Sequence, residues 1–598
     1  MKMLKEYSKK LKNILISFDE DIRPISDWDI SSSVNALIQE LPDKKNLPDD
    51  VFAEHIAFEF REDCKNKENN SGDYFGPSFE MPQGDLWMVF PSKKNITSAI
   101  IEYWKTRAKD SIHPVLKNRY ADLAWTFEKE ITGNRPNIEM AKITIDSAME
   151  VVCKRCHEFE IHTITKLRRA LELSLSIKDK VRSDKVRDSI IAYEEFLSVS
   201  GSNQWGFSYD ILIEENNCIL SDTQKDKIIM DLEKRVIQFS GIEDKSEFNP
   251  FSVKAAALRL AHYYKKHKKK DELKRILLKI DDAFNDVDGA SAILSTAWLQ
   301  EIREIYHRFE IHEESERVAV KIQKVSAKIP EEMESITAKI EIPQRKFKKY
   351  IEEILGDNLE TALNEIICQF IPSRDEAKKQ FDYRLKNSVL SCIISKNIVD
   401  HEGRTLKKIP PAYEDLESNL RHETSQSMNL QSPILRVLFD KCFQRYLVSA
   451  KMLADFIYKS PIFDENDREI IEQGLQLYFE GKYSPAIHVL IPQIERAIRN
   501  IVKLTINNVL KENRSGELQY KLLHDLLADL KAFNVLPEKL LYYFQILLTD
   551  SAGWNLRNII CHGMVPGNLN GAYEADRVIH VFLCLSKVRI KNVDKTPN

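Results

Sequence analysis

The stretch YFEGKYSPAIHVLIPQIERAIRNIVKLTI, residues 478–506, predicts a long amphipathic helix. Ser484 and Pro485 suit the N-cap and the first helical position, so we expect the helix to begin there. Its apolar residues recur at helical spacing and form one face, namely Ile487, Leu490, Ile491, Ile494, Ile498, Ile501 and Val502. Such a face is buried against other helices, and the stretch therefore indicates a helical bundle.

Three apolar stretches that follow predict the other long helices of this bundle, at 517–533, 537–550 and 572–590. Between the last two, Asp550 or Ser551 is expected to cap a further helix. Gly563 and then Pro566 are the stop signals for that helix. Residues 465–598 are therefore expected to form a bundle of about four or five helices.

The rest of the chain also has a helical pattern. Its 598 residues include only 17 Gly and 21 Pro, whereas an all-β protein needs many tight turns. Residues 264–277 and 306–319 share a helix end, a polar turn and an acidic helix start, a layout typical of stacked helical hairpins. We predict an all-α, multi-domain protein. Its parts are an N-terminal helical domain (1–198), an α-solenoid-like segment (199–340), a helical linker domain (341–464) with a loop or short hairpin at 397–415, and the C-terminal bundle (465–598).

The bulk composition limits the class of protein. A net charge of −4 argues against a generally basic nucleic-acid coat protein, although it allows a local basic cleft. No run approaches the roughly 18 apolar residues of a transmembrane helix, so we expect no membrane partner. The lysine-rich N-terminal stretch lacks a secretory signal pattern, and nine scattered cysteines indicate reduced thiols. We therefore expect a cytoplasmic protein.

Two other polar groupings are given structural interpretations. The stretch CKRCHEFEIH, residues 153–162, contains the Cys-x-x-Cys-His pattern of haem attachment, and its cysteines and histidines could also bind zinc. It reads as continuous helix, which does not bring four ligands together, so we expect ordinary thiols and neither a cofactor nor a metal. Asp576 and His580 lie four positions apart on the last helix. They could approach the cleft, but we expect them to form a surface pair.

The stretch WNLRNIICHG, residues 554–563, carries the candidate chemistry. Arg557 and His562 are about 140° apart around a helix, but His562 stands in the final turn, where its ring can swing towards the arginine. Asn558 shares a face with His562. A helix C-terminus favours an imidazolium, and a guanidinium donates to phosphate, so the set suits metal-free RNA cleavage. The structural alternative is an ordinary Arg and His at a helix end.

The motif RNIICHG, residues 557–563, resembles the R-N-x-x-x-H-G signature of a domain of otherwise uncharacterised function, which looks like a branch of the HEPN superfamily. The upstream stretch GKYSPAIHVLIPQIERAIRNI is also similar to a helix of that branch, and the resemblance covers roughly residues 467–590. It implies a dimer of two such domains whose motifs face one cleft. It also implies that Arg557 and His562 are catalytic and that Asn558 is the polar residue between them.

The resemblance has one weaker assignment and one departure. Glu495, on the facing helix, would orient Arg557, and its alternative role is a surface partner of Arg499. Toxins of a related branch carry a tyrosine two positions after the histidine, where a partner enzyme modifies them. Met564 occupies that position here, so we do not expect this control.

These observations lead to one main functional prediction. It is a metal-independent endoribonuclease, acting as a toxin or antiphage defence effector on RNA of unknown class. It would be a homodimer through the C-terminal bundle, regulated by the N-terminal helical region, where a protein or a nucleic acid would act as the trigger. The alternative is a non-catalytic helical scaffold whose bundle mediates dimerisation or binds nucleotide or RNA.

Overall fold

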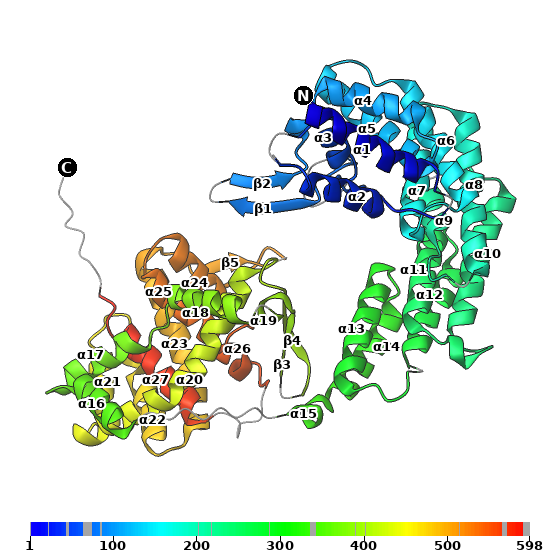
Figure 1. The fold of residues 1–598 in the computed structure, drawn as a ribbon. Coiled ribbons are helices and arrows are strands. Elements are labelled where there is room, and N and C mark those ends of the chain that lie inside the picture. The colour runs from blue at the N-terminus through cyan, green and yellow to red at the C-terminus, as the bar shows by residue number, and fades with distance from the viewer. Residues whose placement is uncertain are drawn as a thin grey trace, which may run out of the picture. The chain divides into compact units, whose positions relative to one another are not determined.

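A computed structural model describes residues 2–21, 23–42, 47–63, 74–83, 86–200, 202–216, 218–285, 287–334, 343–388, 390–400, 402–513, 515–564 and 571–589. Helices dominate these residues, and their strands form three separate two-stranded antiparallel hairpins (Figure 1). The prediction of an all-α protein with several parts is confirmed.

The chain divides into two compact units, the first comprising Met1–Asp288 with Arg308–Ile311 and the second Gly289–His307 with His312–Asn598. The break near residue 288 falls inside the predicted segment 199–340. Each unit is larger than any of the predicted domains, and the finer division into four parts stays a prediction.

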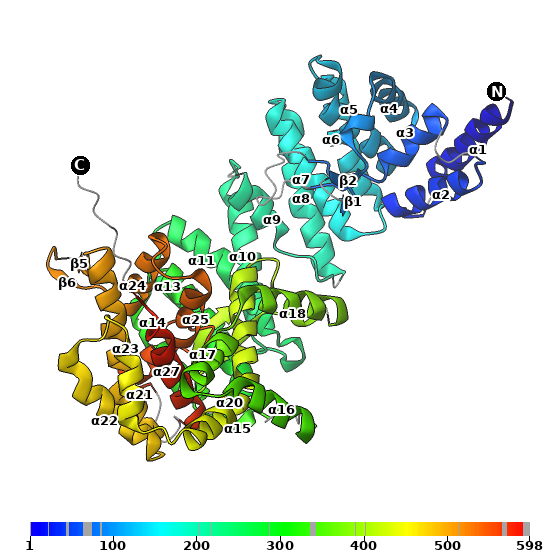
Figure 2. The same cartoon turned by 90° about the vertical axis from the view of Figure 1, so that its left-hand side faces the viewer.

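Unit 1 is built mainly of helices that pack against their neighbours in sequence, from α4 to α8 and from α10 to α12. Figure 2 shows the first of these two series, α4 to α8. Its helices are α1 (Lys2–Asp19), α2 (Asp27–Gln39), α3 (Asp49–Ala57), α4 (Ser98–Asp110), α5 (Pro114–Thr132), α6 (Ile138–Lys154), α7 (Glu160–Ser176), α8 (Lys180–Val199), α9 (Phe207–Tyr209), α10 (Asp222–Phe239), α11 (Pro250–Lys266) and α12 (Lys270–Asn285). One hairpin, β1 (Phe79–Gln83) with β2 (Leu86–Phe90), interrupts them. The short helices η1 (Lys93–Asn95), η2 (Asp210–Glu215) and η3 (Lys245–Glu247) connect longer elements.

The stretch 153–162 is not a continuous helix, which corrects the prediction. Helix α6 ends at Lys154, Arg155 adopts the left-handed conformation at φ 52°, and α7 begins only at Glu160. Residues 25 and 157 form an isolated β-bridge across this break. Tertiary pairing with a distant segment therefore ends a helix that the local sequence would allow to continue.

Unit 2 contains the helices α13 (Ala292–Arg308), α14 (His312–Ser326), α15 (Ile329–Glu332), α16 (Gln344–Leu355), α17 (Leu359–Phe370), α18 (Arg374–Asn387), α19 (Leu390–Ile393), α20 (Leu416–Arg445), α21 (Ala450–Ile457), η4 (Glu465–Asp467), α22 (Arg468–Phe479), α23 (Tyr483–Thr505), α24 (Leu523–Ala532), α25 (Glu538–Leu548), α26 (Leu556–Cys561) and α27 (Ala572–Leu585). A hairpin of β3 (Lys396–Val399) and β4 (Thr405–Ile409) overlaps the stretch 397–415, for which a loop or short hairpin is predicted. A small hairpin of β5 (Leu510–Glu512) and β6 (Leu518–Tyr520) follows α23.

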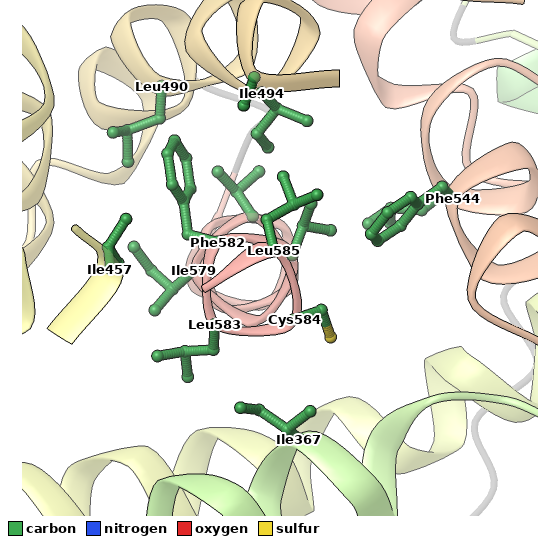
Figure 3. Packing of buried hydrophobic residues seen from close by; sticks show 14 of the residues in the cluster. Ile367, Ile457, Leu490, Ile494, Phe544, Ile579, Phe582, Leu583, Cys584 and Leu585 are labelled. Atoms are coloured by element: carbon green, nitrogen blue, oxygen red, sulfur yellow. The ribbon is translucent and has the colours of Figure 1, made fainter. Parts of the chain in front are cut away.

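The core of unit 2 is arranged around α27. This helix contacts α17, α20, α21 and α23. Figure 3 shows its apolar side chains pointing in several directions, towards Leu490 and Ile494 of α23, Phe544 of α25, Ile367 of α17 and Ile457 of α21. Each such side chain, when fully buried, contributes about 1.5–3 kcal/mol to folding. The core therefore fixes α23 and α25, the two helices against which α26 packs.

Helix α23 confirms the amphipathic pattern from which its fold was predicted. All seven residues of the predicted apolar face, Ile487, Leu490, Ile491, Ile494, Ile498, Ile501 and Val502, are buried. The helix begins at Tyr483 and its N-cap residue is Lys482, two positions before the predicted cap, Ser484. Pro485 still lies in the first turn, where a missing N–H costs no intrahelical bond.

Two predicted helix starts in the bundle are wrong. Residues 518–520 of the expected helix 517–533 form strand β6, because they pair with β5, a contact that the local pattern does not encode. The helix expected to start after Asp550 or Ser551 begins only at Leu556. A turn precedes it, in which the Ala552 amide donates to Asp550 Oδ1 over 2.8 Å.

Asp576 and His580 do not form a surface pair, because α27 is surrounded on several sides and both side chains are fully buried. Asp576 accepts hydrogen bonds from the hydroxyl of Tyr478 at 2.6 Å and from Nη1 of Arg436 at 2.9 Å. His580 Nδ1 lies 2.9 Å from the hydroxyl of Tyr543. Burial raises the pKa of Asp576 to about 6 and lowers the pKa of His580 to about 3.

Candidate functional site

A helix stop fixes the histidine end of α26. The helix ends with His562 as its C-cap, followed by Gly563 at φ 60°. The Gly563 amide donates to the Ile560 carbonyl at 3.2 Å, and the Met564 amide donates to the Ile559 carbonyl at 2.9 Å. This pair of bonds is a Schellman motif, which favours glycine at the left-handed position. The predicted glycine stop is therefore present, and it fixes the backbone at His562.

The start of α26 is fixed by a close approach to α25. A Cβ atom on Gly553 would lie 2.2 Å from the carbonyl oxygen of Ile546, so only glycine fits there. The next amide, that of Trp554, donates to the same carbonyl at 2.9 Å. Asp550, at the head of this turn, also accepts a hydrogen bond from Nη1 of Arg421 at 2.6 Å. The turn is thus tied to both α25 and α20.

Arg557 is held by a carboxylate from the facing helix. Its Nε donates to Oε2 of Glu495 at 2.8 Å, and the two side chains are 14% and 13% exposed. The other oxygen of Glu495 accepts a hydrogen bond from Nη2 of Arg499 at 2.7 Å. Both contacts considered for Glu495 from the sequence are therefore present together. The Arg499 guanidinium in turn lies 5.3 Å from the ring centre of Tyr520 in β6.

Asn558 connects Arg557 to the start of its own helix. Its Oδ1 accepts a hydrogen bond from Nη1 of Arg557 at 3.1 Å, and its Nδ2 donates to Oδ1 of Asn555 at 2.8 Å. Arg557 thus has two acceptors within its own bundle. Its Nη2 group makes no hydrogen bond with any residue that the structure describes, so two donor hydrogens remain for a ligand.

His562 is exposed at the end of the same helix. Its backbone amide donates to the carbonyl of Asn558 at 3.1 Å. Its ring makes no hydrogen bond or ion pair within the described part of the chain. The structure therefore joins Arg557, Asn558 and Glu495 in one network and leaves the imidazole open to solvent beside it.

A cavity of about 190 Å³ lies beside α26, and no pattern in the sequence predicts it. The β3–β4 hairpin forms one wall, and the turn before α26, the helix itself and Met564 form the other. The lining residues are Ile398, Val399, Asp400, Leu406, Ser551, Gly553, Trp554, Asn555, Ile559 and Met564. Asn555 is the one signal that local sequence could have offered, because asparagine tolerates the left-handed conformation, φ 51°, that it adopts here.

One group in unit 1 has the spacing of a metal site. Ligand atoms of Asp27, His157 and His162 lie within 4.8 Å of one another. However, Nδ1 of His157 accepts the amide proton of Phe159 at 3.0 Å, so in the neutral ring Nε2 carries the proton and offers no lone pair. The ammonium group of Lys166 also lies 3.7 Å from Asp27. The proton on Nε2 of His157 and the positive charge of Lys166 together disfavour a divalent cation at this place.

The two cysteines of the same stretch do not join that group. Cys153 is exposed, whereas Cys156 is buried, and burial raises the pKa of Cys156 to about 11. A metal ligand must be a thiolate, which such a pKa disfavours. The interpretation of these residues as ordinary thiols is therefore consistent with their environment.

Comparisons with known proteins identify no relative of this chain: no family model matches it, and neither a curated protein nor a solved structure is significantly similar. Among the described helices, none is both long and apolar enough to cross a bilayer.

Proposed function

We propose that the C-terminal bundle of unit 2 is a metal-independent endoribonuclease of the HEPN type. The observation that carries the proposal is the arrangement of Arg557. Glu495 and Asn558 hold two of its nitrogen atoms, and Nη2 makes no hydrogen bond with the described residues. The short helix that carries Arg557 ends at the exposed His562. A fixed arginine beside a solvent-accessible imidazole supplies the charge and the proton transfer that metal-free RNA cleavage needs.

In the proposed reaction the neutral imidazole of His562 takes the proton of a ribose 2′-hydroxyl. The 2′-oxygen then attacks the adjacent phosphorus, and the bond from phosphorus to the 5′-oxygen breaks. Nη2 of Arg557 donates to a non-bridging phosphate oxygen, on which negative charge grows. The departing 5′-oxygen takes a proton from a second imidazolium. The products are a 2′,3′-cyclic phosphate and a 5′-hydroxyl.

A second copy of the chain is the proposed source of that imidazolium. Paired bundles would place two copies of Arg557 and His562 in one cleft, so that one histidine acts as base and the other as acid. Unit 1 would then regulate the assembly in response to a protein or nucleic-acid trigger. We propose that the enzyme is cytoplasmic and acts as a toxin or antiphage effector.

The test is cleavage of total RNA and of tRNA in EDTA by the wild type, Arg557→Ala and His562→Ala. Arg496→Ala and His488→Ala are matched controls, because both residues lie on α23, and Arg496 is paired with Asp467 outside the network. We expect the wild type and both controls to cleave RNA and leave cyclic phosphate ends, whereas Arg557→Ala and His562→Ala should not cleave. An inert wild type that is folded and dimeric, in the presence of phage-infected cell extract as well, would favour the non-catalytic scaffold instead.

A further inference from the structure

The hydrogen bonds around Asn558 fix the orientation of two side-chain amides. A guanidinium can only donate, so the atom of Asn558 that faces Arg557 is its oxygen. The Nδ2 group of Asn558 must then face Asn555, whose oxygen accepts it at 2.8 Å. By the same logic the Nδ2 group of Asn555 points away from this chain of bonds. The direction of every amide therefore follows from the charge of Arg557.

Asn555 is 7% exposed and lines the cavity beside α26. Its Nδ2 makes no hydrogen bond with the described residues, although its Oδ1 does. This donor can therefore serve a ligand or a water molecule in the cavity. The cavity is thus lined by a residue with an oriented donor that is available to an acceptor.

The other walls of the cavity favour an uncharged, apolar-faced group. Ile398, Leu406 and Ile559 are aliphatic, and Trp554 adds an aromatic ring. The one ionised group, Asp400, is already occupied: its carboxylate accepts the Glu402 and Arg404 amides at 2.9 Å each and Nε of Arg404 at 2.7 Å. No unpaired cation lines the cavity among the described residues, so a phosphate has no partner there.

We propose that this cavity binds one unpaired nucleobase of the RNA substrate, next to the phosphate at Arg557 and His562. Nδ2 of Asn555 donates to a carbonyl oxygen or ring nitrogen on the edge of the base, and the apolar walls contact its faces. The base must be unstacked to enter, so the substrate is single-stranded RNA or a loop. The inference rests on the proposed RNA cleavage, and it adds the substrate class and a residue that selects it.

The bound base would also be linked to the proposed catalytic arginine. A continuous path runs from the base through Asn555 and Asn558 to Arg557 and then to Glu495. A base that fills the cavity immobilises Asn555, and this restricts Asn558 and the guanidinium in turn. Recognition and catalysis would thus share one row of hydrogen bonds.

The experiment measures binding separately from cleavage. Fluorescence anisotropy reports the affinity of full-length His562→Ala for a labelled five-nucleotide RNA and for the same RNA with an abasic central position. We expect the abasic RNA to bind about tenfold more weakly, since stacking and edge contacts of one base have effects of this order. Asn555→Gly and Leu406→Trp, each added to His562→Ala, should reduce that difference to about twofold or less.

The variants are chosen to keep the fold. Glycine suits the left-handed backbone at position 555, and Leu406→Trp fills the cavity from the other wall. Leu518→Trp is the matched control, because it adds the same side chain at an exposed site of β6 and should retain the tenfold difference. Circular dichroism checks each protein.

The outcomes separate the two proposals. Equal affinity for both RNAs, or no binding of either, overturns the base site. A tenfold difference that survives both Asn555→Gly and Leu406→Trp places the base elsewhere and also overturns it. A difference that both variants abolish supports the base site, and if the wild type cleaves no RNA in the same samples, only the proposed cleavage fails.

Discussion

The ion pair between Glu495 and Arg557 allows a quantitative test of the site. Glu495→Ala removes two charge-assisted hydrogen bonds, to Arg557 at 2.8 Å and to Arg499 at 2.7 Å. Arg557→Ala removes the first of these, together with the weaker bond to Asn558 at 3.1 Å, and leaves Glu495 paired with Arg499. A hydrogen bond to a charged group contributes about 1.5–3 kcal/mol, and the partial exposure of these side chains places each bond near the lower limit.

We therefore expect Glu495→Ala to destabilise the packing of α23 on α26 by roughly 2–4 kcal/mol and Arg557→Ala by roughly 1–2 kcal/mol. In the double variant the second change removes a bond that is already lost. The two effects should then fall short of additivity by about 1–2 kcal/mol. Glu495→Gln keeps one acceptor oxygen and loses the negative charge. Its stability should therefore lie between that of the wild type and that of Glu495→Ala.

Hydrogen exchange measured by mass spectrometry is the appropriate assay, because a chain of two units does not unfold in a single step. Peptides that cover 483–505 and 556–561 report local opening at the contact, and peptides from α11 and α12 in unit 1 serve as the internal reference. Strict additivity of the two single variants at the reporting peptides would refute the reasoning, since it would mean that Glu495 and Arg557 do not support each other. Uniform loss of protection in both units would show a general fold defect instead.

Three further predictions concern the frame around the site. Gly553→Ala should destabilise unit 2 by roughly 2–4 kcal/mol in thermal unfolding, because its Cβ would overlap the Ile546 carbonyl and break the bond from Trp554; an unchanged melting temperature would contradict this. The pKa of Asp576 is about 6 in the folded protein and 3.8 in the unfolded chain, so between these pH values only the folded protein holds the proton. The contribution of Asp576 to stability therefore falls as pH rises from about 4 to 6, and Asp576→Asn should remove that fall. The pKa of His580 is about 3 in the folded protein and 6.5 in the unfolded chain, so its contribution to stability rises with pH between about 3 and 6.5, and His580→Gln should remove that rise. Urea titrations at pH 4, 5, 6 and 7 measure both trends, and a trend of the opposite sign at either residue would contradict its prediction.

Periodicity predicted those parts of the fold in which one face of a helix is buried. The apolar face of α23 was predicted residue by residue because burial on one side leaves a regular spacing in the sequence. Helix α27 is buried on several sides, so its polar residues Asp576 and His580 lie inside the core although their spacing resembles a surface pair. Spacing reports which residues share a face and does not report how many faces are covered.

Contacts between distant segments explain what local sequence could not predict. Strand β6 pairs with β5 at the point where a helix was expected to start, and the bridge between residues 25 and 157 accompanies the break before α7. The site shows the same limit. The pairing of Glu495 with Arg557 was anticipated as one of two roles, whereas the cavity formed with the β3–β4 hairpin requires a segment about 150 residues away in sequence, and the RNIICHG motif carries no trace of it.

The charges around Arg557 bear on why a second copy would be needed. Within one chain the network contains Arg557 and Arg499 against Glu495, a net charge of about +1 in a partly buried setting. The phosphorane formed during cleavage carries about two negative charges, so a single bundle compensates only about half of them. Two facing bundles double the positive charge and supply the second imidazole. Glu495→Gln raises the net charge of each bundle by one. If this variant cleaved RNA at protein concentrations too low for dimers, charge would be the main contribution of the second copy. If cleavage by Glu495→Gln still required the dimer, as sedimentation and activity measured over the same dilution series would show, the second histidine would be the contribution that a single chain lacks.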